Sequence, residues 1–468
     1  MPKVAHLDSR DKLDNLWLGF RTRLPAVIPY SWLEKIIKID TRTDQSNKAL
    51  LDFLLPLLKR FDFHTSVTRH QEKGQAFYNV VASTLPHKPT GVFFHTHCDT
   101  VPPGDCALWT RCKGNNPFRL TRTGTRLYGL GSADVKLDLL CKVWALKNFV
   151  GQAPFSLVVA YGEERGLVGA KHVIQTLRKR KDSMALVGEP SQMVPIYAHK
   201  GHAVFTLWVP DQGLRSKAHP LSLETSLYEK EHTFMGKSAH SATPQLGRNA
   251  IMLALEFLRK EKRSVVRLVG GDASNKIPAQ CTLVSRGESN AFTQRLLGLT
   301  ATMAIWAKQL GNHHDRRFTP SYVTCSLNRV ETAERGLILT YDMRLLPRTS
   351  TRHLYQKLQE KTQKWGCKIR SWEVDPPLDG KLESPLCRLT AKSLKLLGLK
   401  PRLATKPTST EAALYAQAGI SSLVIGPGKS VGNVHRPNEY QEWQELHKAV
   451  LFYDMFAAQW LAEENRHG

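Results

Sequence analysis

Short apolar runs that end in turn or charged residues are the feature that most constrains the fold of this 468-residue chain. Four of them are "GVFFHTH" (91–97), "FSLVVAY" (155–161), "MALVGEP" (184–190) and "SSLVIGPG" (421–428). Runs of this length are typical of buried strands, whereas "LDLLCKVWALKNF" and "GAKHVIQTLRK" have apolar residues at helical spacing. Strands that alternate with helices predict an α/β fold with a mixed, largely parallel sheet flanked by helices.

The middle of the chain has a different pattern. "HAVFTLWV" (202–209) and "LILTYDMRLLP" (337–347) are predicted strands, and "FMGKSAHSATPQLGRNAIMLALEFLRK" (234–260) is a predicted loop followed by a helix. A chain of this length is also too long for one ordinary core. We therefore predict an α+β domain over residues 200–376, inserted into a first domain made of residues 1–199 and 377–468.

The composition and the cysteine pattern indicate in which cellular compartment the protein is expected. No run approaches the roughly 18 apolar residues of a membrane span. The start, "MPKVAHLDSRDKLDNLW", is charged and lacks an apolar core, so we expect no secretory signal. The eight cysteines are scattered, with no CxxC pair, which favours a reduced, cytoplasmic protein.

The net charge of +25 raises the question of a nucleic-acid partner. Basic clusters occur at "RKRK" (178–181), "RKEKR" (259–263) and "HHDRR" (313–317). No motif of a known nucleic-acid-binding module accompanies them. We therefore predict a solvated basic surface with weak, salt-sensitive adhesion to polyanions, and no physiological nucleic-acid partner.

Reactive side chains occur where the predicted parallel strands end. His97 ends the first strand, Glu163 and Glu164 follow the second, Glu189 follows the third, and His435 comes shortly after the last. Ligands bind beyond the carboxyl ends of the strands in sheets of this kind. The sequence therefore predicts a site at this edge of the sheet.

Each of these residues also has a structural interpretation. His95, His97 and Asp99 alternate and could share one face of a strand, but a lone histidine is more often structural. Asp134 follows a glycine-rich turn and by itself would be a helix N-cap. The common placement at strand ends favours a metal site instead. Two histidines and three carboxylates can hold two divalent ions, zinc above all, with cobalt or manganese possible, and a further carboxylate can act as a general base.

Five motifs resemble, in this order, the dinuclear-zinc family of acetylornithine deacetylase, succinyl-diaminopimelate desuccinylase, aminoacylase and glutamate carboxypeptidase. They are "HCDTVP" (97–102), "GLGSADVK" (129–136), "GEERG" (162–166), "VGEPS" (187–191) and "VGNVHRPNEY" (431–440). The resemblance runs from about residue 32 to the end of the chain. It implies that two Zn²⁺ ions are held by His97, Asp134, Glu164, Glu189 and His435, with Asp134 as the bridge.

The same resemblance assigns the remaining roles. Glu163 would be the general base, and Asp99 would orient His97. The inserted domain would be a lid that commonly forms a dimer interface in the family. In "GKSAHSATPQLGRNAI" His240 would polarise the scissile carbonyl, often from the partner subunit, while Asn275 and Arg344 would hold the substrate carboxylate.

Three departures from the family pattern bear on substrate preference more than on the metal ligands. Leu137 and Asp138 stand where glycines usually follow the lysine of the D-x-K motif, and Thr96 stands where glycine usually precedes His97. A long stretch, 286–337, separates the Asn275 and Arg344 motifs.

The predicted function is metal-dependent hydrolysis of an N-acyl amino acid, with N-acetylornithine first. A dipeptidase or carboxypeptidase with the same two metals is one alternative. A non-enzymatic binding protein on this fold is another. The sequence distinguishes neither the acyl group nor the metal used in the cell.

Overall fold

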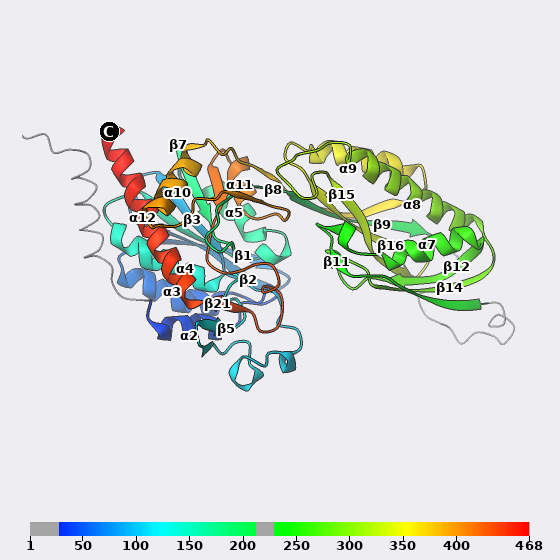
Figure 1. Ribbon diagram of the computed structural model, residues 1–468, viewed down its shortest axis with the longest axis horizontal. Coiled ribbons are helices and arrows are strands. Elements are labelled where there is room, and N and C mark those ends of the chain that lie inside the picture. Colours follow the sequence, from blue (N-terminus) through cyan, green and yellow to red (C-terminus); the bar gives the residue numbers. More distant parts are fainter. Residues whose placement is uncertain (1–27, 212–228, 468) are drawn as a thin grey trace, which may run out of the picture.

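The computed structural model describes residues 28–211 and 229–467. Two lobes lie side by side, each built on its own sheet (Figure 1). The first lobe contains both ends of the described chain, and the second lobe is formed by the middle of the chain. The charged segment "MPKVAHLDSRDKLDNLW" lies outside the described residues, so the expectation of no secretory signal stays a prediction.

The first lobe contains a mixed nine-stranded sheet in the order β1-β2-β6-β3-β7-β20-β8-β18, with β19 paired to β8. The central strands β6, β3, β7 and β20 run parallel, and the flanking strands β1, β2 and β18 pair antiparallel. The bounds are β1 (His64–Glu72), β2 (Gln75–Ser83), β3 (Thr90–His97), β6 (Phe155–Ala160), β7 (Lys179–Val187), β8 (Ile196–His199), β18 (Leu378–Asp379), β19 (Ala404–Lys406) and β20 (Ser421–Val424).

Helices cover both faces of this sheet, which explains why its central strands are continuously apolar. Phe94 of β3 packs in the core beneath α4 and α12, whereas Phe93 packs in the core of the other face, beneath α5 and α11. The helices of this lobe are α2 (Tyr30–Lys38), α3 (Lys48–Arg60), α4 (Lys136–Leu146), α5 (Val168–Thr176), α10 (Pro385–Leu396), α11 (Ala412–Gln417) and α12 (Trp443–His467). The predicted α/β class with a mixed, helix-flanked sheet is confirmed.

The second lobe has a seven-stranded sheet in the order β10-β14-β12-β15-β16-β9-β17. Its strands are β9 (Gly201–Pro210), β10 (Glu229–Met235), β12 (Arg263–Gly270), β14 (Gln280–Glu288), β15 (Thr324–Ala333), β16 (Gly336–Leu345) and β17 (Lys368–Asp375). Its helices are α7 (Ala250–Lys260), α8 (Ala291–Leu310) and α9 (Thr351–Gln363). A short ladder pairs β11 (Ala239–His240) with β13 (Lys276–Ile277). The predicted boundaries at 200 and 376 stay a prediction.

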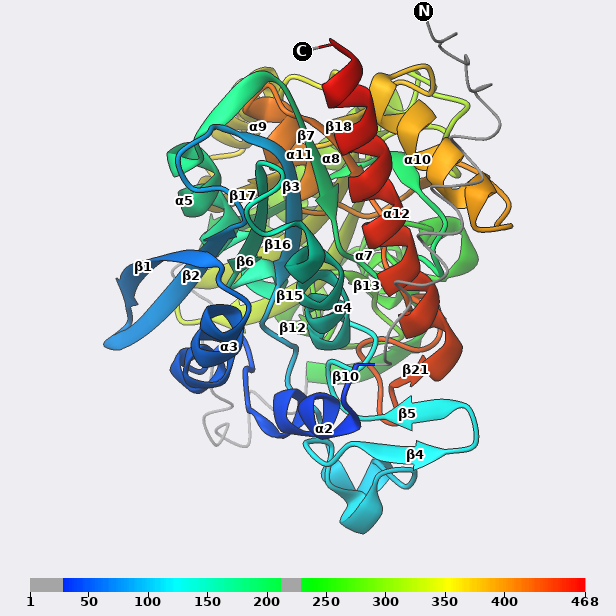
Figure 2. The same ribbon diagram turned by 90° about the vertical axis from the view of Figure 1, so that its left-hand side faces the viewer.

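A small three-stranded sheet joins two distant parts of the first lobe (Figure 2). It consists of β4 (Thr121–Thr123), β5 (Arg126–Tyr128) and β21 (Tyr440–Glu442), with Tyr440 opposite Tyr128. Glycine-rich residues 129–133 follow β5 directly, and the loop of residues 431–439 precedes β21. The sheet therefore brings together two loops that are far apart in sequence, residues 129–133 and 431–439.

Across residues 28–211 and 229–467, no helix is both long enough and apolar enough to span a membrane. All eight cysteines fall within these ranges, and none forms a disulfide.

Candidate metal centre

The parallel strands β3, β6 and β7 end at one edge of the sheet, and each leads to a predicted site residue. His97 is the last residue of β3. Gly162, in the left-handed region at φ 69°, turns the chain after β6 into the 3₁₀ turn η4 (Glu163–Arg165). Glu189 follows β7. The first ligand group is the cluster of His97, Glu163 and Glu189, whose imidazole and carboxylate atoms all lie within 4.8 Å of one another. The sequence resemblance assigns the ligand role in this cluster to His97 and Glu189 and the role of base to Glu163.

The second ligand group is Asp134, Glu164 and His435, again within 4.8 Å. His435 Nε2 lies 2.9 Å from Glu164 Oε1 and 3.3 Å from Asp134 Oδ2. The other oxygen of Asp134, Oδ1, lies 3.2 Å from His97 Nε2. One carboxylate therefore contacts a histidine of each group, which is the position that a bridging ligand needs.

The donor set fits two divalent cations. Carboxylate oxygens and imidazole nitrogens are the ligands that zinc, cobalt and manganese take in proteins. Buried carboxylates in such number are costly unless cations pair with them. Glu163, Glu164 and Glu189 converge with Asp134 on the two histidines, so both groups can each hold one ion.

Asp99 fixes both His97 and the turn that carries the two glutamates. The Asp99 carbonyl oxygen lies 3.1 Å from His97 Nδ1, which places the imidazole proton on Nδ1 and leaves Nε2 for a ligand. The Asp99 carboxylate accepts the backbone N–H groups of Glu163 (3.0 Å) and Glu164 (3.2 Å), and its Oδ1 lies 3.6 Å from His97 Nδ1. Asp99 therefore has the contacts expected of an orienting residue.

His95 lies apart from both groups. Its Nδ1 is 3.0 Å from the Tyr415 hydroxyl, and its Nε2 contacts Glu411. The expectation that His95, His97 and Asp99 face one site is met only by the last two.

Burial and charge shift the protonation of the site strongly. Burial and the neighbouring Glu189 carboxylate raise the pKa of Glu163 well above its usual value, even though His97 opposes this. Burial alone would lower the pKa of His435, but its hydrogen bonds with Asp134 and Glu164 raise it to about 11. The carboxylates of Asp134 and Glu164, which stabilise the protonated form of His435, would also stabilise a metal ion bound beside it.

The three predicted residues of the second lobe gather around Ser241. Its backbone N–H donates to the Asn275 carbonyl oxygen at 3.0 Å, and Arg344 Nη2 donates to its hydroxyl at 3.0 Å. Arg344 is only 3% exposed, and its guanidinium forms two hydrogen bonds of 2.9 Å with Asp342. Arg344 is therefore already paired, so its arrangement fits support of the Ser241 turn more directly than an open carboxylate clamp.

His240 has the protonation that a carbonyl-polarising donor needs. Its surroundings desolvate it, and with the positive charge of Arg344 this lowers the pKa of His240 to about 4. Its Nδ1 accepts the N–H of Ala242 at 3.0 Å. The neutral ring therefore carries its proton on Nε2, which can donate.

Three residues near the metal groups were not predicted from the sequence. Glu439 accepts backbone N–H groups of the loop that carries Asp134, Glu411 pairs with His95, and Lys406 donates to Glu189 at 2.8 Å. Glu439 lies four residues after His435, so its place in "VGNVHRPNEY" was a signal. Lys406 lies in the three-residue strand β19, which has no apolar run, so the sequence pattern did not predict this strand or its lysine.

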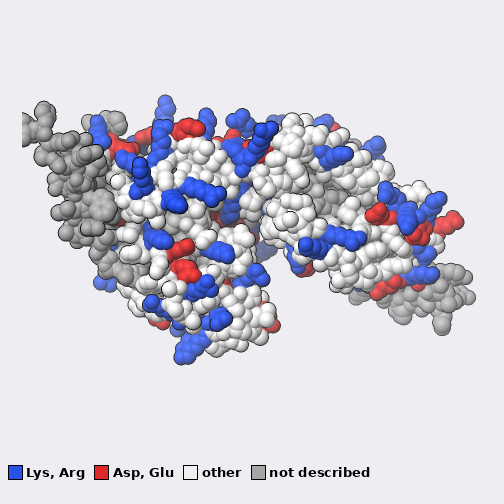
Figure 3. All heavy atoms as spheres, viewed as in Figure 1, with Lys and Arg blue, Asp and Glu red and all other residues white. Residues whose placement is uncertain are grey.

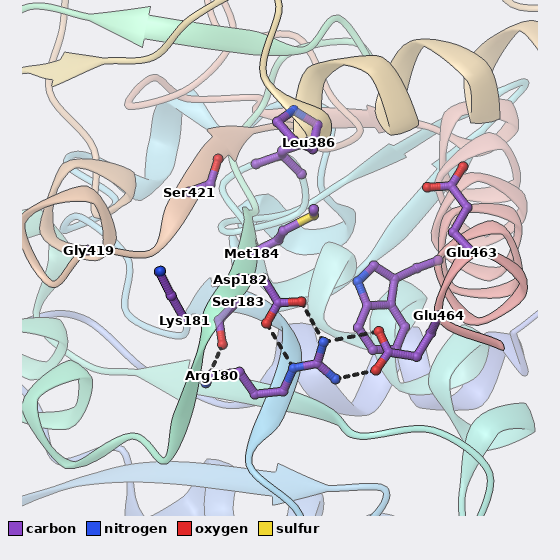
Figure 4. Close-up of a pocket in the computed structure, with 12 residues that line it drawn as sticks. Arg180, Lys181, Asp182, Ser183, Met184, Leu386, Gly419, Ser421, Glu463 and Glu464 are labelled. Carbon is purple, nitrogen blue, oxygen red and sulfur yellow. Dashed lines mark hydrogen bonds and ion pairs between the residues drawn. The ribbon is translucent and has the colours of Figure 1, made fainter. Parts of the chain in front are cut away.

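A pocket far from this edge contains none of the predicted site residues (Figure 4). Arg180, near the start of β7, pairs there with Asp182 and Glu464, and its guanidinium lies over the Trp460 ring. Glu189 follows the opposite end of β7, so this pocket is separate from the metal groups.

Comparisons with known proteins agree with the motifs. Residues 93–459 match the model of Peptidase family M20/M25/M40. The chain is 28% identical over 433 residues to acetylornithine deacetylase of Klebsiella pneumoniae (strain 342), covering 85% of this chain and 87% of that protein. Acetylornithine deacetylase of Salmonella newport (strain SL254) is 28% identical over 431 residues, with the same shares.

Two solved structures have the same fold at low sequence identity. The aminoacylhistidine dipeptidase of Vibrio alginolyticus superimposes with a TM-score of 0.64 at 14% identity, covering 94% of this chain and 97% of that one. The M20 family metallo-carboxypeptidase Sso-CP2 of Sulfolobus solfataricus gives a TM-score of 0.61 at 15% identity, covering 92% and 99%.

Proposed function

Because the chain belongs to Peptidase family M20/M25/M40, a family of metal-dependent hydrolases, we propose that it hydrolyses the amide bond of an N-acyl amino acid. The proposed substrate is N-acetylornithine, and the products are ornithine and acetate. The observation that carries the proposal is Asp134, whose two oxygens each contact a histidine of a different ligand group. The acetylornithine deacetylases among its relatives support the choice of substrate.

Two divalent ions, Zn²⁺ in this proposal, would be held by His97, Asp134, Glu164, Glu189 and His435. Co²⁺ or Mn²⁺ suits the same donors. Ions bound there would supply Lewis acidity, which makes water easier to deprotonate and polarises a carbonyl oxygen.

The reaction then depends on two side chains of the protein. Glu163 takes a proton from water while the water oxygen attacks the amide carbon. The His240 Nε2–H donates to the carbonyl oxygen as negative charge develops on it. Glu163 returns the proton to the amide nitrogen as the C–N bond breaks, which releases the amine and the carboxylate. Asn275 and Arg344 would position the substrate carboxylate, Arg344 through its contact with Ser241.

The experiment is amine release from N-acetylornithine by zinc-reconstituted protein, compared with Glu163→Ala. We expect release by the native protein, loss of release in the variant and unchanged metal content, because Glu163 is proposed as the base and not as a ligand. Substantial activity in Glu163→Ala would contradict the role of Glu163.

A peptidase is the second candidate function, and the dipeptidase and carboxypeptidase among the structural neighbours favour it. A panel of N-succinyl amino acids, dipeptides and C-terminally extended peptides separates it from a deacylase. Inactivity on every substrate, together with low metal content, would instead support a binding protein on this fold.

We also propose a cytoplasmic homodimer that forms through the second lobe and works in arginine biosynthesis, without a membrane or nucleic-acid partner. The sequence resemblance supports the dimer, as does strand β10, which forms an edge of the second sheet among the described residues.

A further inference from the structure

A lysine lies directly beside one of the two ligand groups. Lys406 Nζ donates a hydrogen bond of 2.8 Å to Glu189 Oε2. The other oxygen of this carboxylate, Oε1, lies 3.8 Å from His97 Nε2. Within the described ranges, Asp134 and Glu164 form ion pairs with histidines only. The two groups therefore differ in one fixed positive charge.

The fold holds Lys406 in this place. Lys406 is the last residue of β19 and pairs in parallel with His199 of β8. The N–H of Lys200 donates to the Lys406 carbonyl oxygen at 3.1 Å. The Lys406 side chain is only 17% exposed. The ammonium is thus anchored by its backbone and directed at the metal groups.

The ammonium of Lys406 and the carboxylate of Glu189 form an ion pair of 2.8 Å in which the Glu189 side chain is only 8% exposed. An incoming divalent cation would meet this ammonium at Glu189.

We propose that Lys406 is a built-in cation that competes with a divalent ion for Glu189 and weakens metal binding by His97 and Glu189. The reason is electrostatic: an ammonium next to a ligand carboxylate repels an incoming dication and occupies one of the two oxygens. Among the described residues no lysine or arginine forms a direct ion pair with Asp134 or Glu164, so the Asp134–Glu164–His435 group fills at lower metal concentration. The inference rests on the proposed function for the presence of two ions and adds the residue that makes them unequal.

The test is a Mn²⁺ titration of chelator-stripped protein, with free Mn²⁺ followed by electron paramagnetic resonance. Mn²⁺ is the probe because it prefers oxygen ligands and leaves the eight cysteines alone. We expect two classes of site in the native protein and at least about a tenfold gain in affinity of the weaker class in Lys406→Met. Lys406→Arg keeps the charge and should keep the weak class. Lys400→Met, at an exposed lysine shortly before β19, should leave both classes unchanged.

Ligand variants identify the group that responds. Glu164→Gln removes a ligand of the second group, so in this background Lys406→Met should tighten the remaining ion. In Glu189→Gln the competing carboxylate is gone, so Lys406→Met should have no effect. Thermal unfolding of each apo variant checks that it folds, and Lys406→Gln replaces Lys406→Met if that variant does not.

Several results would overturn the inference. Unchanged affinities in Lys406→Met would show that the ammonium does not compete, and weaker binding would show that it holds Glu189 in place for the ion. The titration needs no substrate, so its outcome is separate from that of the deacetylase assay. A single class of Mn²⁺ site, or no Mn²⁺ binding in the native protein, would reject the inference of two unequal ions, and the deacetylase assay with Zn²⁺ tests the proposed function independently.

Discussion

At the scale of single residues, Asp134 is an example of a residue whose role could be predicted from sequence only weakly and is clear from its contacts in the folded chain. Its sequence position fits a helix N-cap, and only the folded chain places its two oxygens against His97 and His435. These histidines are 338 residues apart, and no local pattern encodes the distance between them. The ligand types and their order could be predicted, but the contacts that hold the ligands could not.

Glu439 is the clearest of these unpredicted contacts, and its removal gives the first prediction. Its carboxylate accepts the N–H groups of Gly131 (3.1 Å), Ala133 (2.8 Å) and Asp134 (3.0 Å) in a buried place. Glu439→Gln keeps the size but turns one acceptor into a donor that faces other donors. We expect a loss of about 2–3 kcal/mol in the free energy of unfolding and weaker metal binding by the second group.

Urea denaturation and Mn²⁺ titration measure the two effects of Glu439→Gln. The matched control is Glu442→Gln, on the adjoining strand, where a partly exposed carboxylate pairs with Arg126. That change should cost less than about 1 kcal/mol. Equal losses in the free energy of unfolding of the two variants would contradict the larger contribution that we assign to the buried Glu439 carboxylate.

His199 supplies a prediction on pH. Burial lowers the pKa of His199 to about 3, while Nδ1 lies 2.9 Å from the Lys200 carbonyl oxygen and the Thr410 hydroxyl lies 3.0 Å from Nε2. The unfolded chain binds a proton near pH 6.5 and the folded chain does not. Stability from this group is therefore complete above about pH 6.5 and is lost as the pH falls toward 3, by about 1.4 kcal/mol per pH unit.

The variant His199→Asn should lose that pH dependence. We expect it to be less stable than the native protein at pH 7.5 and to approach the native value as the pH falls to 4.5, as measured by urea denaturation at each pH. His313→Asn, at an exposed position, should follow the native curve. Parallel curves for His199→Asn and the native protein would show that His199 does not titrate as proposed.

At the scale of elements, the long strands and helices were predictable because each carries its own apolar pattern. Strand β3, with Phe93 and Phe94 on opposite faces, is an example. Short elements such as β11, β13 and β19 contain two or three residues and owe their pairing to neighbours distant in the chain. Three of the site's features depend on them: His240, Asn275 and Lys406.

Helix α4 explains one departure from the family pattern and carries a stability prediction. Asp138, where the family usually has glycine, lies one turn from Lys142, with Nζ to Oδ2 at 2.6 Å, and the Tyr453 hydroxyl donates to Oδ1 at 2.7 Å. Both charges are fully buried. Lys142→Met would leave Asp138 without its counter-ion, which typically costs about 3–5 kcal/mol.

The double variant Asp138→Leu/Lys142→Met separates the charge effect from packing. Because it removes both buried charges, we expect it to recover much of the stability lost in Lys142→Met, as measured by urea denaturation. A double variant as unstable as the single one would mean that shape, and not the unpaired charge, governs this part of α4. Packing is tight there, since a Cβ on Gly188 would lie 2.1 Å from Asp138 Oδ2.

At the scale of the whole molecule, ion pairs connect the two lobes. Lys171 of α5 lies 3.3 Å from Asp375 of β17, and Arg317 lies 2.7 Å from Asp379 of β18. Lys and Arg side chains are spread over the visible face of both lobes and form no single patch there (Figure 3). This distribution is consistent with the predicted solvated basic surface, although no partner follows from it. The sequence patterns predicted the two domains. The contacts between the lobes could not be predicted, because they depend on how the folded lobes pack against each other.

The sheet of the second lobe ends at strand β10. In the described ranges, β10 pairs only with β14 and so forms an edge of its sheet. Three apolar side chains between residues 235 and 252 of this lobe are exposed: Met235 of β10 (64%), Leu246 (61%) and Met252 of α7 (40%). An edge strand with exposed apolar neighbours is prone to pair with another chain.

We therefore predict that the native protein is a dimer and that Met235→Glu/Met252→Glu is a monomer at micromolar concentration, as measured by light scattering after size exclusion. In a symmetric interface each added carboxylate would lose its hydration and would also face the same carboxylate of the other copy. Both the desolvation and the repulsion between like charges disfavour the dimer. Ile305→Glu, at an apolar side chain of α8 that is 60% exposed, should leave the dimer intact. A monomeric native protein would contradict the prediction and would require His240 to serve the metal groups of its own chain.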